Sequence, residues 1–106
     1  MPPASIHPGE ILADEITEIA TSPTELARQI NVQAKRISDI INGRRGITGD
    51  TALRLGHWFG TSAQFWLNLQ TAYDLGVAKL RIGREVAALP VRKPSPTEDT
   101  KLIATR

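Results

Sequence analysis

The fold of this chain is decided by residues 22–46, SPTELARQINVQAKRISDIINGRRG, which predict two short helices joined by a tight turn. Ser22 can cap the first helix, Pro23 suits its first position, and Glu25 stands three residues after the cap, where a capping box needs an acid. Asn31 follows this helix, and asparagine is the residue that best tolerates a left-handed turn after glycine. Together these features predict a helix-turn-helix.

Both helices of this motif have an apolar face. The residues that recur at helical spacing are Leu26, Ala27, Ile30, Ile37, Ile40 and Ile41. Val32 is expected to be the buried turn residue, and Gly43 can end the second helix. The second helix keeps polar residues on its outer face, as a DNA-reading helix does: Gln33, Lys35, Arg36 and Asp39.

Further helices are expected on both sides of the motif. One runs from about Pro8 to Ala20, and its buried stripe is formed by Leu12, Ile16 and Ile19. Another begins at a Thr48 cap and ends at Gly60, and its inward positions are Ala52, Leu55 and Phe59.

A fifth helix is predicted from a second capping-box pattern, Thr61 with Gln64, to about Tyr73. The large side chains gathered along it are Phe65, Leu69 and Tyr73 on one face, with Trp66 beside them. Most of the aromatic material lies in residues 58–73, which we expect to form the centre of the core or of a dimer contact.

Residues 74–89 can continue this helix, with three leucines directed inward, Leu75, Leu80 and Leu89. Gly76 and Gly83 each lower its intrinsic stability by about 1 kcal/mol relative to alanine. From Pro90 the composition becomes rich in proline and polar residues, which is typical of a linker. The last residues, 101–106, can form a strand only if another segment offers an edge.

Length and composition indicate one soluble domain. The chain has 106 residues and a hydrophobic content of 41%, which suits a single core. It has no cysteine, so disulfides and thiolate metal sites are excluded. No apolar run reaches bilayer length, and the first residues do not resemble a signal peptide. We therefore expect a cytoplasmic protein.

Charge is distributed unevenly although the formal net charge is only +2. The charged side chains before Arg28 are all acids: Glu10, Asp14, Glu15, Glu18 and Glu25. From Arg28 to Arg54, six cations stand against two acids, Asp39 and Asp50. Such runs are usually solvated helix faces, but here the basic set coincides with the helix-turn-helix. We therefore expect a polyanion to bind that face and to avoid the first helix.

Signals for enzyme chemistry are weak. His7 and His57 are far apart in sequence, and neither has a metal-ligand neighbour at helical spacing. The acids near the N-terminus have no accompanying nucleophile or phosphate loop. The GRRG run at residues 43–46 lacks the Lys-Ser/Thr ending of a P-loop. We therefore predict that the protein is no enzyme and holds no cofactor or metal.

Several motifs resemble the HigA family of antitoxins, a branch of the XRE-type, phage-repressor-like DNA-binding proteins. Besides the helix-turn-helix, they are IHPGEIL at 6–12, NGRRGIT at 42–48, TALRLGHWFGTS at 51–62 and QFWLNLQTAYDL at 64–75. The resemblance covers about residues 6–78, and the succession of HPGE, ALRL and FWLNLQ makes it specific.

This resemblance implies an all-α fold, a five-helix lambda-repressor-like DNA-binding domain at residues 6–78 with its helix-turn-helix at about 22–43. A C-terminal helical extension and tail would follow at 79–106. Such proteins are homodimers that bind a palindromic operator in double-stranded DNA, repress their own operon, and neutralise a HigB toxin, a RelE-like ribonuclease that cuts mRNA. A stand-alone XRE-type regulator without a toxin is the alternative, and a protein-binding module that has lost DNA binding is a third hypothesis.

The chain departs from the family pattern at three positions. Asn31 stands where the turn usually has glycine. Gln33 replaces the Ser or Thr that normally caps the recognition helix, so that helix should begin less firmly. Asp39 occupies a position where relatives often carry a base-contacting Arg, and its carboxylate can accept from cytosine or orient Arg36. The operator sequence therefore cannot be copied from relatives.

The resemblance, taken together with the residues themselves, predicts three sets of binding residues. The expected DNA-binding residues are Gln33, Lys35, Arg36 and Asp39 at base edges, Ser38 at bases or backbone, and Thr24, Arg44 and Arg45 at phosphates. The expected dimer interface is Phe65, Trp66, Leu69 and Tyr73. The expected toxin-binding residues are acids that would complement a basic ribonuclease, Glu10, Asp14, Glu15 and Glu18. The segment after Tyr73 is the alternative toxin site.

Overall fold

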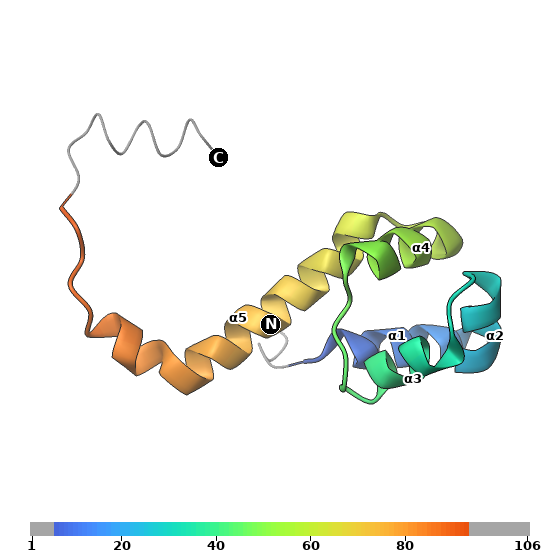
Figure 1. Ribbon diagram of the computed structural model, residues 1–106, viewed down its shortest axis with the longest axis horizontal. Helices are drawn as coiled ribbons and strands as arrows, with labels where there is room; N and C mark the ends of the chain where they lie inside the picture. Colours follow the sequence, from blue (N-terminus) through green and yellow to red (C-terminus); the bar gives the residue numbers. More distant parts are fainter. Residues whose placement is uncertain (1–5, 94–106) are drawn as a thin grey trace.

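The computed structural model describes residues 6–93, and all regular structure within that range is helical. The five helices are α1 (Pro8–Glu18), α2 (Pro23–Gln29), α3 (Ala34–Ile41), α4 (Gly49–Phe59) and α5 (Ala63–Ala87). Figure 1 shows α1 to α4 grouped to one side of the first part of α5, while the rest of α5 projects away. The predicted all-α, five-helix fold is confirmed. The strand considered for residues 101–106 lies outside the described residues.

The helix-turn-helix forms where the sequence predicts it. Ser22 Oγ accepts from the backbone N–H of Glu25 at 3.1 Å, and Asn31 has a φ of +60° in the turn. The acidic half of the predicted capping box is wrong, because the Glu25 carboxylate binds Arg28 at 2.6 Å and Gln29 at 2.8 Å instead. The charge-assisted bond to Arg28 is the stronger alternative, and it lowers the pKa of Glu25 to about 2.

The start of α1 is capped by a residue that the sequence analysis did not single out. His7 Nδ1 accepts from Gly9 N–H at 2.9 Å, and His7 N–H donates to Glu10 Oε2 at 3.2 Å, which completes a capping box. Histidine is not among the usual N-cap residues, so the pattern was not recognisable. A Cβ at Gly9 would lie 1.9 Å from the carbonyl oxygen of Ile40. The HPGE motif therefore fixes the start of α1 against α3.

The cap of α5 lies one residue later than predicted. Ser62 Oγ accepts from the backbone N–H of Phe65 at 3.0 Å. Thr61, the predicted cap, instead accepts a hydrogen bond from the indole N–H of Trp66 at 3.1 Å, and the side chain of Gln64 is bonded elsewhere on α5. A buried indole needs an acceptor, and this requirement decides how the Thr61 hydroxyl is used. The caps of α4, Thr48 and Gly60, are as predicted.

The core is formed by the inner faces of the helices and two residues outside them, Ile30 and Ile47. Its buried apolar members are Leu12, Ile16, Leu26, Ala27, Ile30, Ile37, Ile40, Ile47, Ala52, Leu55 and Trp66. α1 packs against α3 and α5, α2 against α3, and α4 against α5. The prediction that Ile19 is buried is wrong: α1 ends at Glu18, and Ile19 is a half-exposed C-cap.

α5 passes Tyr73 and continues without a break to Ala87, so it includes most of residues 74–89, the continuation that the sequence allowed. The leucines expected to point inward along this continuation are exposed: Leu75, Leu80 and Leu89. Figure 1 shows why, since the distal half of α5 extends past the other helices and no described segment covers it. α5 passes residue 78 without interruption. The predicted division into a domain at 6–78 and an extension at 79–106 therefore remains a proposal. No helix within residues 6–93 combines the length and apolar character needed to span a bilayer.

Candidate nucleic-acid interface

The outer face of α3 and the loop after it carry most of the predicted DNA-binding residues. The exposed members of this set are Thr24, Gln33, Lys35, Arg44 and Arg45. Gln33 is the N-cap of α3 and makes no side-chain cap hydrogen bond, as predicted from its residue type. Ser38 is half-buried, and its hydroxyl donates to the Lys35 carbonyl at 3.3 Å. This face therefore presents several exposed polar side chains to solvent.

Asp39 is buried, which corrects the prediction that it lies on the outer face of the helix. Its side chain is 9% exposed, whereas the three cations around it are 45–74% exposed. Lys35 Nζ donates to Oδ2 at 3.0 Å, and Arg44 Nη1 donates to Oδ1 at 3.4 Å. Arg45 Nη2 lies 3.9 Å from Oδ2. We call these four residues, Asp39, Lys35, Arg44 and Arg45, the Asp39 cluster.

The local backbone gathers the Asp39 cluster. Lys35 and Asp39 are one helical turn apart, a spacing that is visible in the sequence. The arginines approach because the chain reverses at Gly43, whose φ is +76°, and Arg44 N–H then donates to the Asp39 carbonyl at 2.8 Å. The hydrogen bond from Lys35 contributes most to lowering the pKa of Asp39. Three cations around one carboxylate leave the cluster with a net charge of +2.

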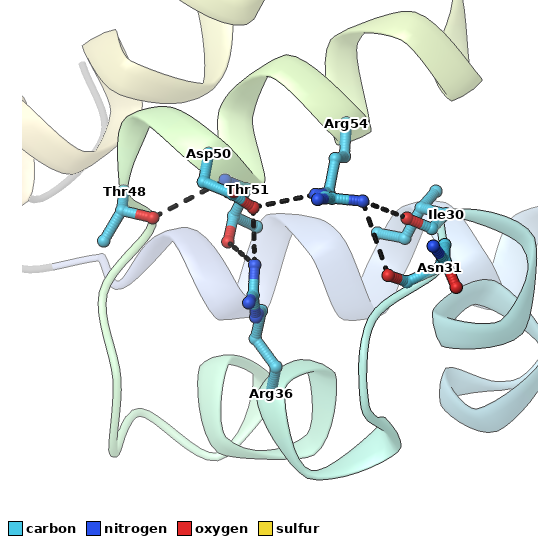
Figure 2. A network of polar contacts seen from close by, with 7 residues as sticks. All are labelled: Ile30, Asn31, Arg36, Thr48, Asp50, Thr51 and Arg54. Atoms are coloured by element: carbon cyan, nitrogen blue, oxygen red, sulfur yellow. Dashed lines mark hydrogen bonds and ion pairs between the residues drawn. The ribbon is translucent and has the colours of Figure 1, made fainter.

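Arg36 turns from the predicted base-reading face toward α4, as Figure 2 shows. Its Nη1 donates to Asp50 Oδ1 at 2.6 Å and to Thr51 Oγ1 at 3.4 Å. The Arg36 side chain is 30% exposed, and Thr51 is buried. The sequence predicted that Arg36 lies on the outer face of the helix with Lys35. In the structure Arg36 instead bonds to the first turn of α4.

Arg54 extends this contact to the turn between α2 and α3. Its Nε donates to Asp50 Oδ1 at 2.8 Å, and its Nη1 donates to the carbonyl oxygens of Ile30 and Asn31 at 2.9 and 3.4 Å (Figure 2). Hydrogen bonds from Arg54 and then from Arg36 lower the pKa of Asp50. We call Asp50, Arg36 and Arg54 the Asp50 cluster. The sequence did not predict the Asp50 cluster. Asp50 and Arg54 are one helical turn apart, but Arg36 is 14 residues from Asp50.

A concave pocket of about 450 Å³ lies beside the N-terminus of α3. Its lining combines the α2–α3 turn with polar and cationic side chains: Asn31, Val32, Gln33, Lys35, Arg36 and Arg45. Half of the predicted DNA-binding residues therefore meet around one concavity. A donor-rich hollow of this kind suits a phosphate or the acceptor edge of a base.

The predicted dimer residues occupy different environments along α5. Trp66 is fully buried in the core of its own protomer, so its predicted contact with a partner is wrong. Phe65 is partly exposed, and Leu69 packs against the core. Tyr73 stacks edge-on against His7, with ring centroids 4.8 Å apart.

The predicted toxin-binding residues lie along α1: Glu10, Asp14, Glu15 and Glu18. All except Glu15 are exposed, and no ion pair within the described range involves them. Their negative charge is therefore available to a basic partner. Residues 6–93 hold no group of three His, Cys, Asp or Glu side chains suited to a metal ion.

Comparison with known proteins found no matching family model. Virulence-associated protein I of Dichelobacter nodosus is 51% identical over 76 residues, which cover 71% of this chain and 70% of the relative. The structure of an addiction module antidote protein of a HigA family from Coxiella burnetii is 44% identical with a TM-score of 0.82, over 88% of this chain and 100% of that one. Antitoxin HigA of Pseudomonas aeruginosa, solved with the higBA promoter, is 46% identical with a TM-score of 0.78, over 81% of this chain and 96% of that one.

Proposed function

This chain belongs to the HigA family of antitoxins, and we propose that it binds operator DNA as a homodimer, represses its own operon and neutralises a HigB-like toxin. The observation that carries the DNA-binding role is the Asp39 cluster, whose three exposed cations stand on and beside the second helix of a helix-turn-helix. The protein acts by binding and not by catalysis. Its place of action is the DNA in the cytoplasm.

The pocket beside α3 faces the major groove in this proposal. Gln33 and Lys35 line it and reach base edges, while Ser38 contacts bases or backbone. Arg36 would have to leave Asp50 to reach DNA, so we assign it to holding α3 against α4.

Phosphate contacts come from the margins of the same face. Arg44 and Arg45 lie in the loop after α3, and Thr24 lies in the first turn of α2. These contacts fix the position of the protein on the duplex and carry no sequence information.

We place the dimer contact on the distal half of α5, with a second copy of this chain as the occupant. Apolar side chains recur there at spacings of three and four residues: Leu75, Ala78, Ile82 and Val86. A palindromic operator needs two recognition helices at fixed spacing, and a symmetric α5 contact supplies it. Ile82→Asp should therefore give folded monomers in sedimentation. A wild-type monomer that binds the operator as one copy would contradict this placement.

We place part of the toxin contact on α1, because ribosome-dependent ribonucleases of this type are usually basic and the α1 acids form no ion pair within the described range. Reversing Asp14 and Glu18 to Lys should slow toxin association at low salt and leave operator binding intact. An unchanged association rate would move the contact to α5. If no toxin gene accompanies the chain and no HigB-like toxin binds it, the stand-alone regulator is the better description.

The DNA-binding role is tested by titrating the chain's own promoter and a scrambled duplex at several salt concentrations. Lys35, Arg44 and Arg45 of two protomers bring six cations to the duplex, which should displace the counterions of roughly 4 to 6 phosphates and give a log–log salt slope of about −4 to −5. The promoter should be bound much more tightly than the scrambled duplex. A slope near zero, or equal binding of both duplexes, would remove the proposal.

A further inference from the structure

We propose that Asp39 is a positioning residue for operator recognition: it touches no DNA and holds Lys35, Arg44 and Arg45 in the arrangement that meets the operator. This inference rests on the proposed DNA binding. An acid in a DNA-binding face is unfavourable by itself, because it repels phosphate and weakens the attraction of the cations around it. A buried aspartate at the centre of such a face therefore calls for a structural role.

Both oxygens of the Asp39 carboxylate already accept from neighbouring cations. Oδ2 accepts from Lys35 at 3.0 Å and faces Arg45 at 3.9 Å, while Oδ1 accepts from Arg44 at 3.4 Å and from Lys35 at 3.3 Å. The side chain is 9% exposed, so accepting from cytosine would require Asp39 to displace a cation and to reach past it. This geometry opposes the direct base contact that the residue type alone allows.

The cations gain order from this arrangement. Lys and Arg side chains have many rotamers, and three of them gathered on one face also repel one another. A carboxylate among them offsets the repulsion and restricts their rotamers before DNA arrives, which reduces the entropy lost on binding. Each cation has further N–H donors and remains 45–74% exposed, so it can bind a phosphate while still bonded to Asp39.

The proposal makes a prediction whose sign opposes simple electrostatics. Asp39→Asn keeps the side-chain shape and removes one negative charge per protomer. The net charge therefore rises by one, and charge alone predicts tighter binding to any DNA. If Asp39 positions the cations, operator binding should instead weaken by about tenfold, the equivalent of a lost charge-assisted hydrogen bond. Binding to scrambled DNA should stay unchanged or become tighter, so the ratio of operator to scrambled affinity should fall.

Asp74→Asn is the charge-matched control. Asp74 lies on α5, where its exposed carboxylate accepts from Gln70 at 2.9 Å, and it belongs to neither cluster. The same charge change at that position should leave the ratio of operator to scrambled affinity unchanged. Circular dichroism and thermal melting check that each variant folds. If Asp39→Asn unfolds, Asp39→Ser replaces it, since serine is smaller and keeps a hydrogen-bond acceptor.

A double-mutant cycle separates positioning from a purely structural role. Arg44→Ala should weaken operator binding strongly in the wild-type background and several-fold less in the Asp39→Asn background, because Arg44 is already misplaced there. Additive losses, or operator binding by Asp39→Asn that is as tight as wild type or tighter, would overturn the inference. Failure of the wild-type chain to bind its promoter would instead overturn the proposed function, so the two failures are distinct.

Discussion

The Asp39 cluster and the Asp50 cluster each pair an aspartate with a cation of α3, yet they expose opposite partners. Asp39 is buried beneath exposed cations, whereas Asp50 is 54% exposed and its partner Arg36 is 30% exposed. The first arrangement presents positive charge to solvent, and the second uses positive charge to join segments of the protein. What an Arg–Asp pair does for a binding surface therefore depends on which of the two partners is buried.

Lys35 and Arg36 show this difference within one dipeptide. Neighbouring residues on a helix point about 100° apart, since one turn contains 3.6 residues. That rotation directs Lys35 toward Asp39 and the outer face, and Arg36 toward Asp50 and α4. The two adjacent cations therefore differ in role: Lys35 stays on the outer face, whereas Arg36 joins α3 to α4.

The largest expected effect comes from removing the exposed arginines of the Asp39 cluster. Arg44→Ala combined with Arg45→Ala should weaken binding to operator and scrambled DNA alike, by about 100-fold, and reduce the size of the salt slope by about 3 to 4 per dimer. The melting temperature should hardly change, because both side chains are exposed. A loss confined to the operator would show that these arginines read bases, and the two clusters would then differ in another way.

A smaller effect, of a different kind, is expected from Arg36→Ala. This change removes the link between α3 and α4, so the melting temperature should fall by about 2 to 5 °C while discrimination between operator and scrambled DNA stays within about threefold. Arg28→Ala is the matched control, because within residues 6–93 the ion pair of Arg28 is with Glu25, on the surface of α2. An unchanged melting temperature together with lost discrimination at one base of each half-site would make Arg36 a base reader and break the comparison.

The smallest effect concerns how salt acts on the two carboxyls. The pKa of each lies below its ordinary value, so the stabilisation each provides is complete above the ordinary aspartate pKa and is lost as pH falls through the lowered value. Added salt screens exposed pairs more than buried ones. Raising the salt concentration should therefore return the pKa of Asp50 toward normal more than that of Asp39.

Carboxyl NMR titrations at low and high salt measure this difference. Glu25, whose pKa is lowered to about 2 by its surface pair with Arg28, provides an internal reference and should respond as Asp50 does. Equal salt responses of Asp39 and Asp50 would mean that burial does not distinguish the two clusters.

The helix-turn-helix was predictable because its determinants are local. Its local signals are the N-cap Ser22 and two residues with positive φ, Asn31 and Gly43. Each residue type is typical of the backbone conformation that it adopts. The Lys35–Asp39 pair was also within reach, since one helical turn separates the two residues. What the sequence could not show is that the chain reversal at Gly43 brings two arginines back over Asp39 and buries it.

The contacts that escaped prediction depend on tertiary structure. Arg36 and Asp50 are 14 residues apart and meet only after α3 and α4 are in place. Trp66 was predicted at the dimer interface from its sequence position. It is buried in the core instead, and its indole N–H donates to Thr61. The sequence allowed the fifth helix to continue past Tyr73 but did not decide its length, because Gly76 and Gly83 weaken a helix intrinsically. Their cost is small beside the gain of an unbroken 25-residue segment.

Because α5 is one uninterrupted helix, a rotation at one of its ends displaces the other. Its 25 residues span about 37 Å at 1.5 Å per residue, and it links the helix-turn-helix side of the molecule to its far apolar end. A tilt of only about 5° at that end would move the other by about 3 Å, nearly the rise of one base pair along a DNA strand. Any partner that bends or tilts this one helix would therefore change which half-site spacing the protein can span.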